Sequence, residues 1–151
     1  MVLAKIEAPP LSCGKGPEES YRLIWIHAFS STRPVVVTLE RSGRTWSVVG
    51  VELTGFVEKT VARRTSRRLS NEEAATLART IESTAFWNTR VALDPEGAID
   101  GDTWVIEGRH GKAYHAVRRS GNEHGGPQTL GMMFVRLAGL QPQRFMPGGP
   151  E

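Results

Sequence analysis

The chain has 151 residues with 19 basic and 16 acidic groups, and this length and formal net charge of +3 fit one ordinary domain. No stretch approaches the roughly 18 apolar residues of a membrane-spanning helix. A single cysteine excludes an intramolecular disulfide and a multi-cysteine metal site. Arginine outnumbers lysine 15 to 4, which favours either bidentate recognition of anions or a GC-rich genome, and which by itself selects no function.

The first 20 residues mix proline, glycine and charge without periodicity, and we expect residues 1–20 to be a flexible N-terminal arm. Leu11-Ser12-Cys13 is similar to the cleavage site of bacterial lipoproteins, but prolines stand where an apolar segment should precede it. We therefore expect a cytoplasmic protein without a membrane span. A periplasmic or lipid-anchored protein, attached through Cys13, is the less favoured alternative.

Two segments rich in aromatic and β-branched residues, 21–29 and 35–53, predict the first three strands. We expect Ser42-Gly43 to form a two-residue hairpin turn that pairs Arg41 with Arg44. This register gives one apolar face and one mostly polar face, as a half-buried antiparallel sheet requires. The apolar face then consists of Val35, Val37, Leu39, Trp46 and Val48.

Residues 56–69 are expected to be extended, with arginine on both faces of the second half. A buried central strand could not accommodate such charges, so we expect an edge strand whose charges discourage aggregation. This cluster is also the densest basic patch, and binding of a nucleic-acid backbone through it is an alternative function. The cluster consists of Arg63, Arg64, Arg67 and Arg68.

Ser70 and Glu73 have the spacing of a capping box, which predicts the start of a helix with an apolar stripe. The helix should stop near Phe86-Trp87, and residues 88–101 should form a loop. The acids of this loop lack the order of a calcium-binding loop. The four histidines lack the spacing of a metal site, and no phosphate-binding motif is present, so we expect neither a metal nor a cofactor.

Residues 102–119 predict a second hairpin across His110-Gly111, with Arg109 paired to Lys112. In this register Glu107 lies directly opposite Tyr114, and Trp104 lies on the other face. A last helix begins near Pro127, which suits a first helical turn. Its expected core residues are Leu130, Met133, Phe134, Leu137 and Leu140.

The predicted fold is therefore α+β: a single antiparallel sheet in the order ββββ-α-ββ-α with both helices on one face. We expect one domain over residues 21–145 and a flexible tail over residues 146–151.

Four motifs of the chain are Tyr21-Arg22, Phe86-Trp87, a Trp-Val-Ile-Glu-Gly strand over residues 104–108 and a Tyr-His-Ala-Val-Arg-Arg strand over residues 114–119. In this pattern, residues 21–140 resemble a group of small bacterial α+β proteins of unknown activity, some of which look like lipoproteins. The resemblance implies the fold and a bacterial source, and it implies no reaction.

Acidic, aromatic and basic side chains converge most densely on the second hairpin and the loop before it, and we expect function there. The candidate residues for binding a partner are Asp100, Asp102, Glu107, Tyr114 and Arg118. Since no coherent catalytic set is visible, the favoured function is a non-enzymatic bacterial protein-binding domain of the inhibitor or toxin-immunity type. A small hydrolase or proton-transfer enzyme is the second alternative. It would use Glu107, Tyr114 and a histidine, with His27 and His115 candidates to share a pocket.

Overall fold

The computed structural model describes residues 8, 10–14, 16–26, 33–54, 60–93, 102–120 and 125–140. The strands are β1 (Glu19–Ile26), β2 (Val35–Ser42), β3 (Thr45–Leu53), β4 (Val61–Arg68), β5 (Ala92–Leu93), β6 (Thr103–His110) and β7 (Ala113–Ser120). The helices are α2 (Asn71–Ser83) and α3 (Gly126–Leu137), with two short 3-10 helices, η1 (Leu11–Cys13) and η2 (Phe86–Asn88).

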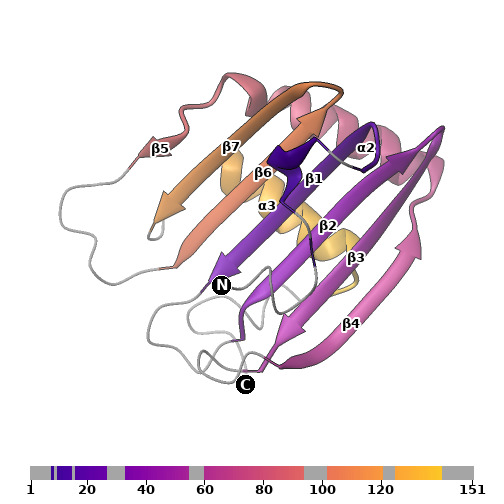
Figure 1. Ribbon diagram of the computed structural model, residues 1–151, viewed down its shortest axis with the longest axis vertical. Helices are drawn as coiled ribbons and strands as arrows, with labels where there is room; N and C mark the ends of the chain where they lie inside the picture. The colour runs from indigo at the N-terminus through magenta and orange to yellow at the C-terminus, as the bar shows by residue number, and fades with distance from the viewer. Residues whose placement is uncertain are drawn as a thin grey trace.

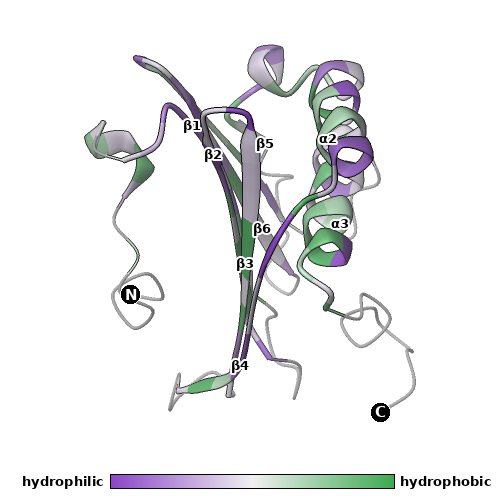
Figure 2. Cartoon of the chain, turned by 90° about the vertical axis from the view of Figure 1, so that its right-hand side faces the viewer, coloured by the Kyte–Doolittle hydropathy of each residue, from purple (hydrophilic) through white to green (hydrophobic). Residues whose placement is uncertain are grey.

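Six of the strands form an antiparallel sheet in the order β4-β3-β2-β1-β6-β7 (Figure 1). The two-residue β5 extends the sheet beyond β7 in parallel orientation, within a segment for which we expected only loop. Both helices cover the same face of the sheet (Figure 2). The predicted α+β class, the element order and the segregation of the helices are therefore confirmed.

The first hairpin turns one residue later than we expected. Ser42 pairs with Thr45, so the central turn residues are Gly43-Arg44 and the expected pairing of Arg41 with Arg44 is wrong. Gly43 has a φ of 60°. A positive φ at the first central position is the requirement of a type II′ turn, which matches the twist of the flanking strands.

The second hairpin repeats this correction. His110 pairs with Ala113, Gly111 has a φ of 58°, and the expected pairing of Arg109 with Lys112 is wrong. In both hairpins the register moves by two residues rather than one. Because side chains alternate with a period of two, every strand residue keeps its expected face.

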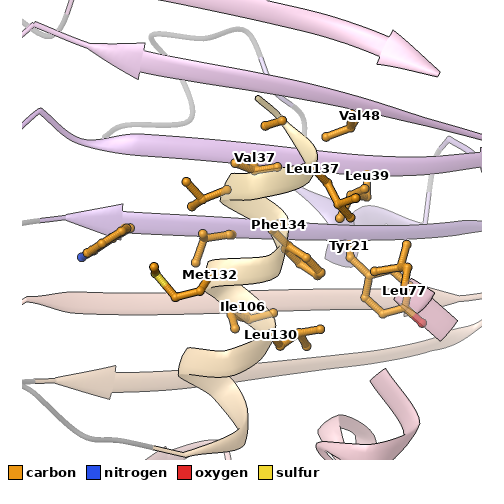
Figure 3. Close-up of a cluster of buried hydrophobic side chains, with 14 of the residues drawn as sticks. Tyr21, Val37, Leu39, Val48, Leu77, Ile106, Leu130, Met132, Phe134 and Leu137 are labelled. Atoms are coloured by element: carbon orange, nitrogen blue, oxygen red, sulfur yellow. The ribbon is translucent and has the colours of Figure 1, made fainter. Parts of the chain in front are cut away.

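The core lies between the sheet and the helices, as Figure 3 shows. Alternate residues of the four central strands point toward α3 and are almost fully buried, among them Leu23 of β1 and Ile106 of β6. Trp25 stacks on its cross-strand neighbour Trp104 with ring centroids 4.0 Å apart. Together these residues form one continuous apolar layer, which is the main source of stability in a domain of this size.

The two helices form for local reasons and dock through apolar stripes. The capping box of α2 is present, because Ser70 accepts from the Glu73 amide and Glu73 accepts from the Ser70 amide. Leu77 and Ile81 are the buried residues of α2. On α3, the expected Met133 is only half-buried. The buried residues of α3 are Leu130, Gly131, Met132, Phe134, Val135 and Leu137.

After α2 the chain turns sharply through Ala85, which has a φ of 50° although it is not glycine. This left-handed residue brings Phe86 into the core beside Tyr21, with ring centroids 6.0 Å apart. The ring of Phe86 packs against the backbone of Gly108, where an added Cβ would lie 2.5 Å from the Phe86 Cε1 atom. Glycine is required at this point of β6 because an aromatic ring occupies the place of its side chain.

Part of the segment in which we expected no regular structure packs on the sheet. Strand β1 begins at Glu19 rather than Tyr21, and η1 buries Leu11. Among the described residues, no helix is both long and apolar enough to cross a bilayer.

Candidate functional site

The face of the sheet opposite the helices, here called the open face, is the candidate functional surface (Figure 2). The registers place every second strand residue on it. One end of the face is apolar, around the buried Val36 and Val51. The other end is polar and carries Arg22, Glu107 and Tyr114.

At the polar end, three side chains from three neighbouring strands form a connected chain. The Tyr114 hydroxyl donates to Glu107 Oε1 at 2.8 Å, and Glu107 Oε2 lies 3.7 Å from Arg22 Nη1. Arg22 Nε donates to the Thr38 hydroxyl at 3.4 Å. Glu107 lies opposite Ala116 and is diagonal to Tyr114, which a long side chain can reach. The expected proximity of Glu107 and Tyr114 is therefore present, although their expected direct pairing is wrong.

The three side chains of this connected chain differ in burial, and their exposure increases from Arg22 through Glu107 to Tyr114. Arg22 is 1% exposed, Glu107 is 8% exposed and Tyr114 is 42% exposed. Burial lowers the pKa of the Arg22 guanidinium, and the Glu107 carboxylate opposes this shift. Arginine nevertheless stays charged at neutral pH, so the buried carboxylate has a cation beside it.

The phenol of Tyr114 is held in its protonated form. Burial, and then the hydrogen bond to the Glu107 carboxylate, raise its pKa to about 12. At neutral pH this hydroxyl donates its hydrogen bond to the Glu107 carboxylate, while Tyr114 as a whole stays exposed to solvent.

The remaining candidate residues of the second hairpin do not all join this group. Arg118 is exposed on the open face. It pairs with Val105, which is two residues before Glu107 on β6. Asp102 instead accepts a hydrogen bond from the Trp25 indole at 3.0 Å, so it is tied to a core side chain. Asp100 lies outside the described residues.

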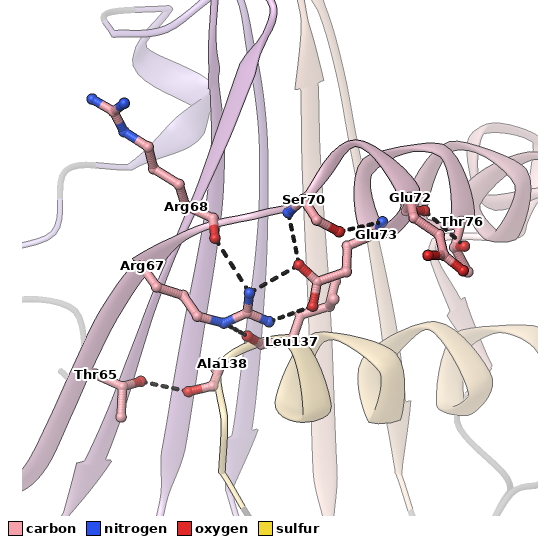
Figure 4. A network of polar contacts seen from close by, with 9 residues as sticks. All are labelled: Thr65, Arg67, Arg68, Ser70, Glu72, Glu73, Thr76, Leu137 and Ala138. Atoms are coloured by element: carbon pink, nitrogen blue, oxygen red, sulfur yellow. Dashed lines mark hydrogen bonds and ion pairs between the residues drawn. The ribbon is translucent and has the colours of Figure 1, made fainter.

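The arginine cluster of β4 is divided between the two faces of the sheet. Arg64 and Arg68 lie on the open face, whereas Arg63 and Arg67 lie on the helix face. Figure 4 shows that Arg67 has a structural role: its guanidinium binds the Glu73 carboxylate at 2.7 and 2.9 Å and the Leu137 carbonyl at 2.9 Å. The hydrogen bond from Arg67 lowers the pKa of Glu73 to about 2.

The edge position expected for this strand is confirmed, because β4 is the first strand in the sheet order. The cluster is not one continuous basic surface. Arg67 is neutralised by Glu73, and the other three arginines cannot all point toward one planar partner.

Of the two histidines named as candidates for an enzyme site, His115 does not meet Glu107 and Tyr114. His115 lies on the helix face, where its ring nitrogen is 2.8 Å from the Thr89 carbonyl and its ring packs against Phe86. His27 lies outside the described residues. Within the described part of the chain, no group of three or more His, Cys, Asp or Glu side chains could hold a metal ion.

Arg22 is the central residue of the polar chain, and sequence reasoning missed it as a site residue. The available signal was a charge between Tyr21 and Leu23 in a segment whose other residues from 21 to 26 are all apolar or aromatic. Such a charge must be paired if the strand is central. Only the sheet order shows that it is central, because β1 has β2 on one side and β6 on the other.

Residues 10–14 and 16–18 border the polar end of the open face. Arg109, beside Glu107 on β6, donates to the carbonyls of Gly14 and Pro17, and the Gly111 amide donates to the Glu18 carbonyl. Three buried atoms near this contact, Ser20 Oγ, Glu107 Oε2 and Arg109 Nε, make no hydrogen bond in the described structure. The contact between this segment and the sheet therefore leaves some buried polar atoms without a hydrogen bond, which costs free energy of folding.

Comparison of the chain with protein-family models, with curated proteins and with solved structures finds no match. The resemblance to small bacterial α+β proteins stays a prediction.

Proposed function

We propose that this chain is a protein-binding domain of the inhibitor or toxin-immunity type, which contacts its partner through the open face around Tyr114. The observation that carries the proposal is a solvent-exposed aromatic ring whose hydroxyl is fixed by a buried, charge-paired carboxylate. Tyrosine and arginine are the side chains most often found at the energetic centres of protein interfaces, and Arg118 lies on the same face.

Preorganisation supports a binding role for this face. A side chain that is already held in one orientation loses little conformational entropy when a partner docks on it. The Glu107 carboxylate provides this restraint for Tyr114, and the Arg22 guanidinium lies 3.7 Å from the same carboxylate. Inhibitors and immunity proteins act by tight association, which gains most from such a rigid surface.

The enzyme alternative has weaker support from this geometry. A proton-transfer site needs a base near the proton that moves. The phenol with its pKa of about 12 keeps its proton at neutral pH, and His115 is on the opposite face of the sheet. The arrangement of Arg22, Glu107 and Tyr114 therefore supports a rigid binding surface better than it supports acid–base catalysis.

The test is site-specific photo-crosslinking in a lysate of the source organism. A photoreactive amino acid replaces Arg118 on the open face in one variant and Arg79, which is exposed on α2, in the control. We expect one protein to be crosslinked from position 118 and not from position 79. Identical products from both positions would contradict the proposal.

The crosslinked protein is then purified and its affinity for the chain is measured. Tyr114→Ala should weaken binding by about 2 kcal/mol, or about 30-fold, as truncation of an aromatic anchor does. Arg79→Ala, at an exposed side chain of α2 on the helix-covered side of the sheet, is the control and should leave the affinity unchanged. An inhibitor or immunity protein should also suppress the activity of this partner at equimolar concentration. Equal affinities of the wild type and Tyr114→Ala would refute the assignment of the surface.

A further inference from the structure

We propose that the outer edge of β4 is a second binding surface, which accepts an extended acidic segment of a partner protein as an added antiparallel strand. The proposal is independent of the surface around Tyr114, because Tyr114 is on β7, five strands away from β4 in the sheet order. It rests on three features of β4: its position at the edge of the sheet, the contacts that hold its helix face against α2 and α3, and the distribution of its charges.

Strand β4 is a long edge strand that nothing covers in the described structure. It is eight residues long, pairs with β3 on its inner side and ends the sheet on its outer side. All of its residues except the half-buried Thr65 are exposed. An edge of this kind presents unpaired amide and carbonyl groups, which are the groups an added strand binds.

The edge is held rigid by contacts with the end of α3 and the start of α2. The Thr65 hydroxyl donates to the Ala138 carbonyl at 2.7 Å, and Arg67 links the Leu137 carbonyl to the Glu73 carboxylate (Figure 4). Opposite Thr65, a Cβ added to Gly50 would lie 2.8 Å from the Ala138 Cβ atom, so the chain after α3 packs directly on this strand pair. A template fixed in this way loses little entropy when a strand is added.

The charges of β4 select the chemistry of the added strand. Segment 61–68 contains four arginines and no acidic residue. Arg67 is neutralised by Glu73, and within the described structure Arg63, Arg64 and Arg68 form no ion pair. A second copy of β4, paired antiparallel over its full length, would bring four more arginines and no carboxylate to the same edge, so it would gain no cross-strand ion pair. A strand with carboxylates at these positions would gain from the same arrangement.

Placement on both faces favours a strand over a flat anionic surface such as a duplex. Arg64 and Arg68 project from the open face and Arg63 from the helix face. A nucleic-acid duplex that docks on one face cannot reach the arginine on the other. The side chains of an added strand alternate between the two faces, so one strand meets all three arginines at once.

The probe is an acetylated and amidated peptide, Glu-Thr-Val-Thr-Glu-Glu-Thr-Val, whose glutamates lie opposite Arg68, Arg64 and Arg63 in an antiparallel register. It is titrated into the full-length, ¹⁵N-labelled chain, and amide shifts and hydrogen exchange are followed. We expect protection of alternate amides within residues 61–68. A peptide with lysine in place of glutamate should not bind.

Two series of N-methylated versions of the peptide distinguish strand addition from simple charge attraction. One series carries methyl groups on the amides that face β4, and the other carries them on the amides that face solvent. We expect the first series to lose binding and the second to keep it. Equal binding of both series, or no amide protection at millimolar peptide, would overturn the proposal.

Two further arms test the assigned arginines and the competing ligand. The double variant Arg64→Gln/Arg68→Gln should weaken peptide binding about two- to fivefold for each arginine. Arg44→Gln, at an exposed arginine in the β2–β3 turn, is the control and should change nothing. Amide shifts of residues 61–68 at a lower concentration of a short DNA duplex than of the peptide would instead assign the cluster to nucleic acid.

Discussion

The two faces of the sheet use the same strands but hold their side chains by different forces. On the helix face, β1 presents Tyr21, Leu23 and Trp25 to a layer of apolar side chains from α2 and α3. On the open face, the same strand presents Arg22, which is equally buried but is held by a carboxylate and a hydroxyl. Apolar burial is roughly proportional to area and has no direction, whereas a buried charge needs particular partners at particular positions.

The difference predicts how each face responds to substitution. The helix face should lose stability in proportion to the apolar volume removed. The open face should respond to whether charges remain matched, so that a double substitution is milder than a single one. The following predictions run from the largest expected effect to the smallest.

Trp104→Ala removes the ring that stacks on Trp25 and packs against Gly131. We expect the free energy of unfolding to fall by about 3–5 kcal/mol, as for other large aromatic side chains in cores, in a urea titration followed by circular dichroism. Val91→Ala, at an exposed site, should change the stability by less than about 0.5 kcal/mol. A loss below about 1 kcal/mol for Trp104→Ala would mean that the apolar layer is not the main source of stability.

Glu107→Gln keeps the size of the side chain and removes the carboxylate charge that lies 3.7 Å from the buried Arg22 guanidinium. The expected loss is about 3 kcal/mol, at the low end for a broken buried ion pair because Glu107 is slightly exposed. The double variant Arg22→Met/Glu107→Leu should recover most of this loss. Additive losses in the double variant would show that the open face is held by packing alone.

Gly108→Ala tests the close approach between β6 and η2. The new Cβ would lie 2.5 Å from Phe86 Cε1 and 2.9 Å from Tyr21 Cε1, so the rings must move. We expect a loss of about 1–3 kcal/mol, the usual effect of overpacking. Combination with Phe86→Leu should give less than the sum of the two single effects, and strict additivity would place the strain elsewhere.

Alkaline pH gives the smallest effect and acts on the open face through Tyr114. Its pKa is raised from 10.0 to about 12 in the folded chain, so the neutral phenol is favoured by folding. This contribution is complete below pH 10 and is lost as the pH rises from about 10 to 12. Burial also raises the pKa of Tyr21 on the helix face.

Tyr114→Phe should therefore reduce the decrease of stability above pH 10 without abolishing it, because Tyr21 still titrates. The measurement is a series of urea titrations between pH 8 and pH 11.5. Identical pH dependence in the wild type and Tyr114→Phe would show that the hydroxyl of Tyr114 is not held by Glu107 in solution.

Much of the fold was predictable because its signals are local. Alternation of apolar residues identified the long strands, and the Ser70–Glu73 capping box identified the start of α2. The errors are also local: both turns were placed one residue early, because a glycine can supply the positive φ of either central turn position. Strand β5 was missed because two residues that pair with β7 leave no periodic pattern.

The candidate site was predictable only in part. The proximity of Glu107 and Tyr114 followed from the alternation within one hairpin, which survives a shift of two residues. The hydrogen bond from Trp25 to Asp102 and the ion pair of Arg22 with Glu107 could not be predicted. Both involve β1, which is some 80 residues distant in sequence from β6. Similarly, nothing in the sequence of β4 distinguished Arg67, which binds Glu73, from the arginines beside it.

By itself, then, the sequence determined which residues form strands and helices, where a helix starts and which side chains share a face, since these depend on neighbours a few residues away. The tertiary structure decided which strand is central, which charges are buried together and which sheet edge stays open. These properties depend on the order in which distant strands pair. A period of two specifies the face of a side chain, but it carries no information about the strand that lies beside it.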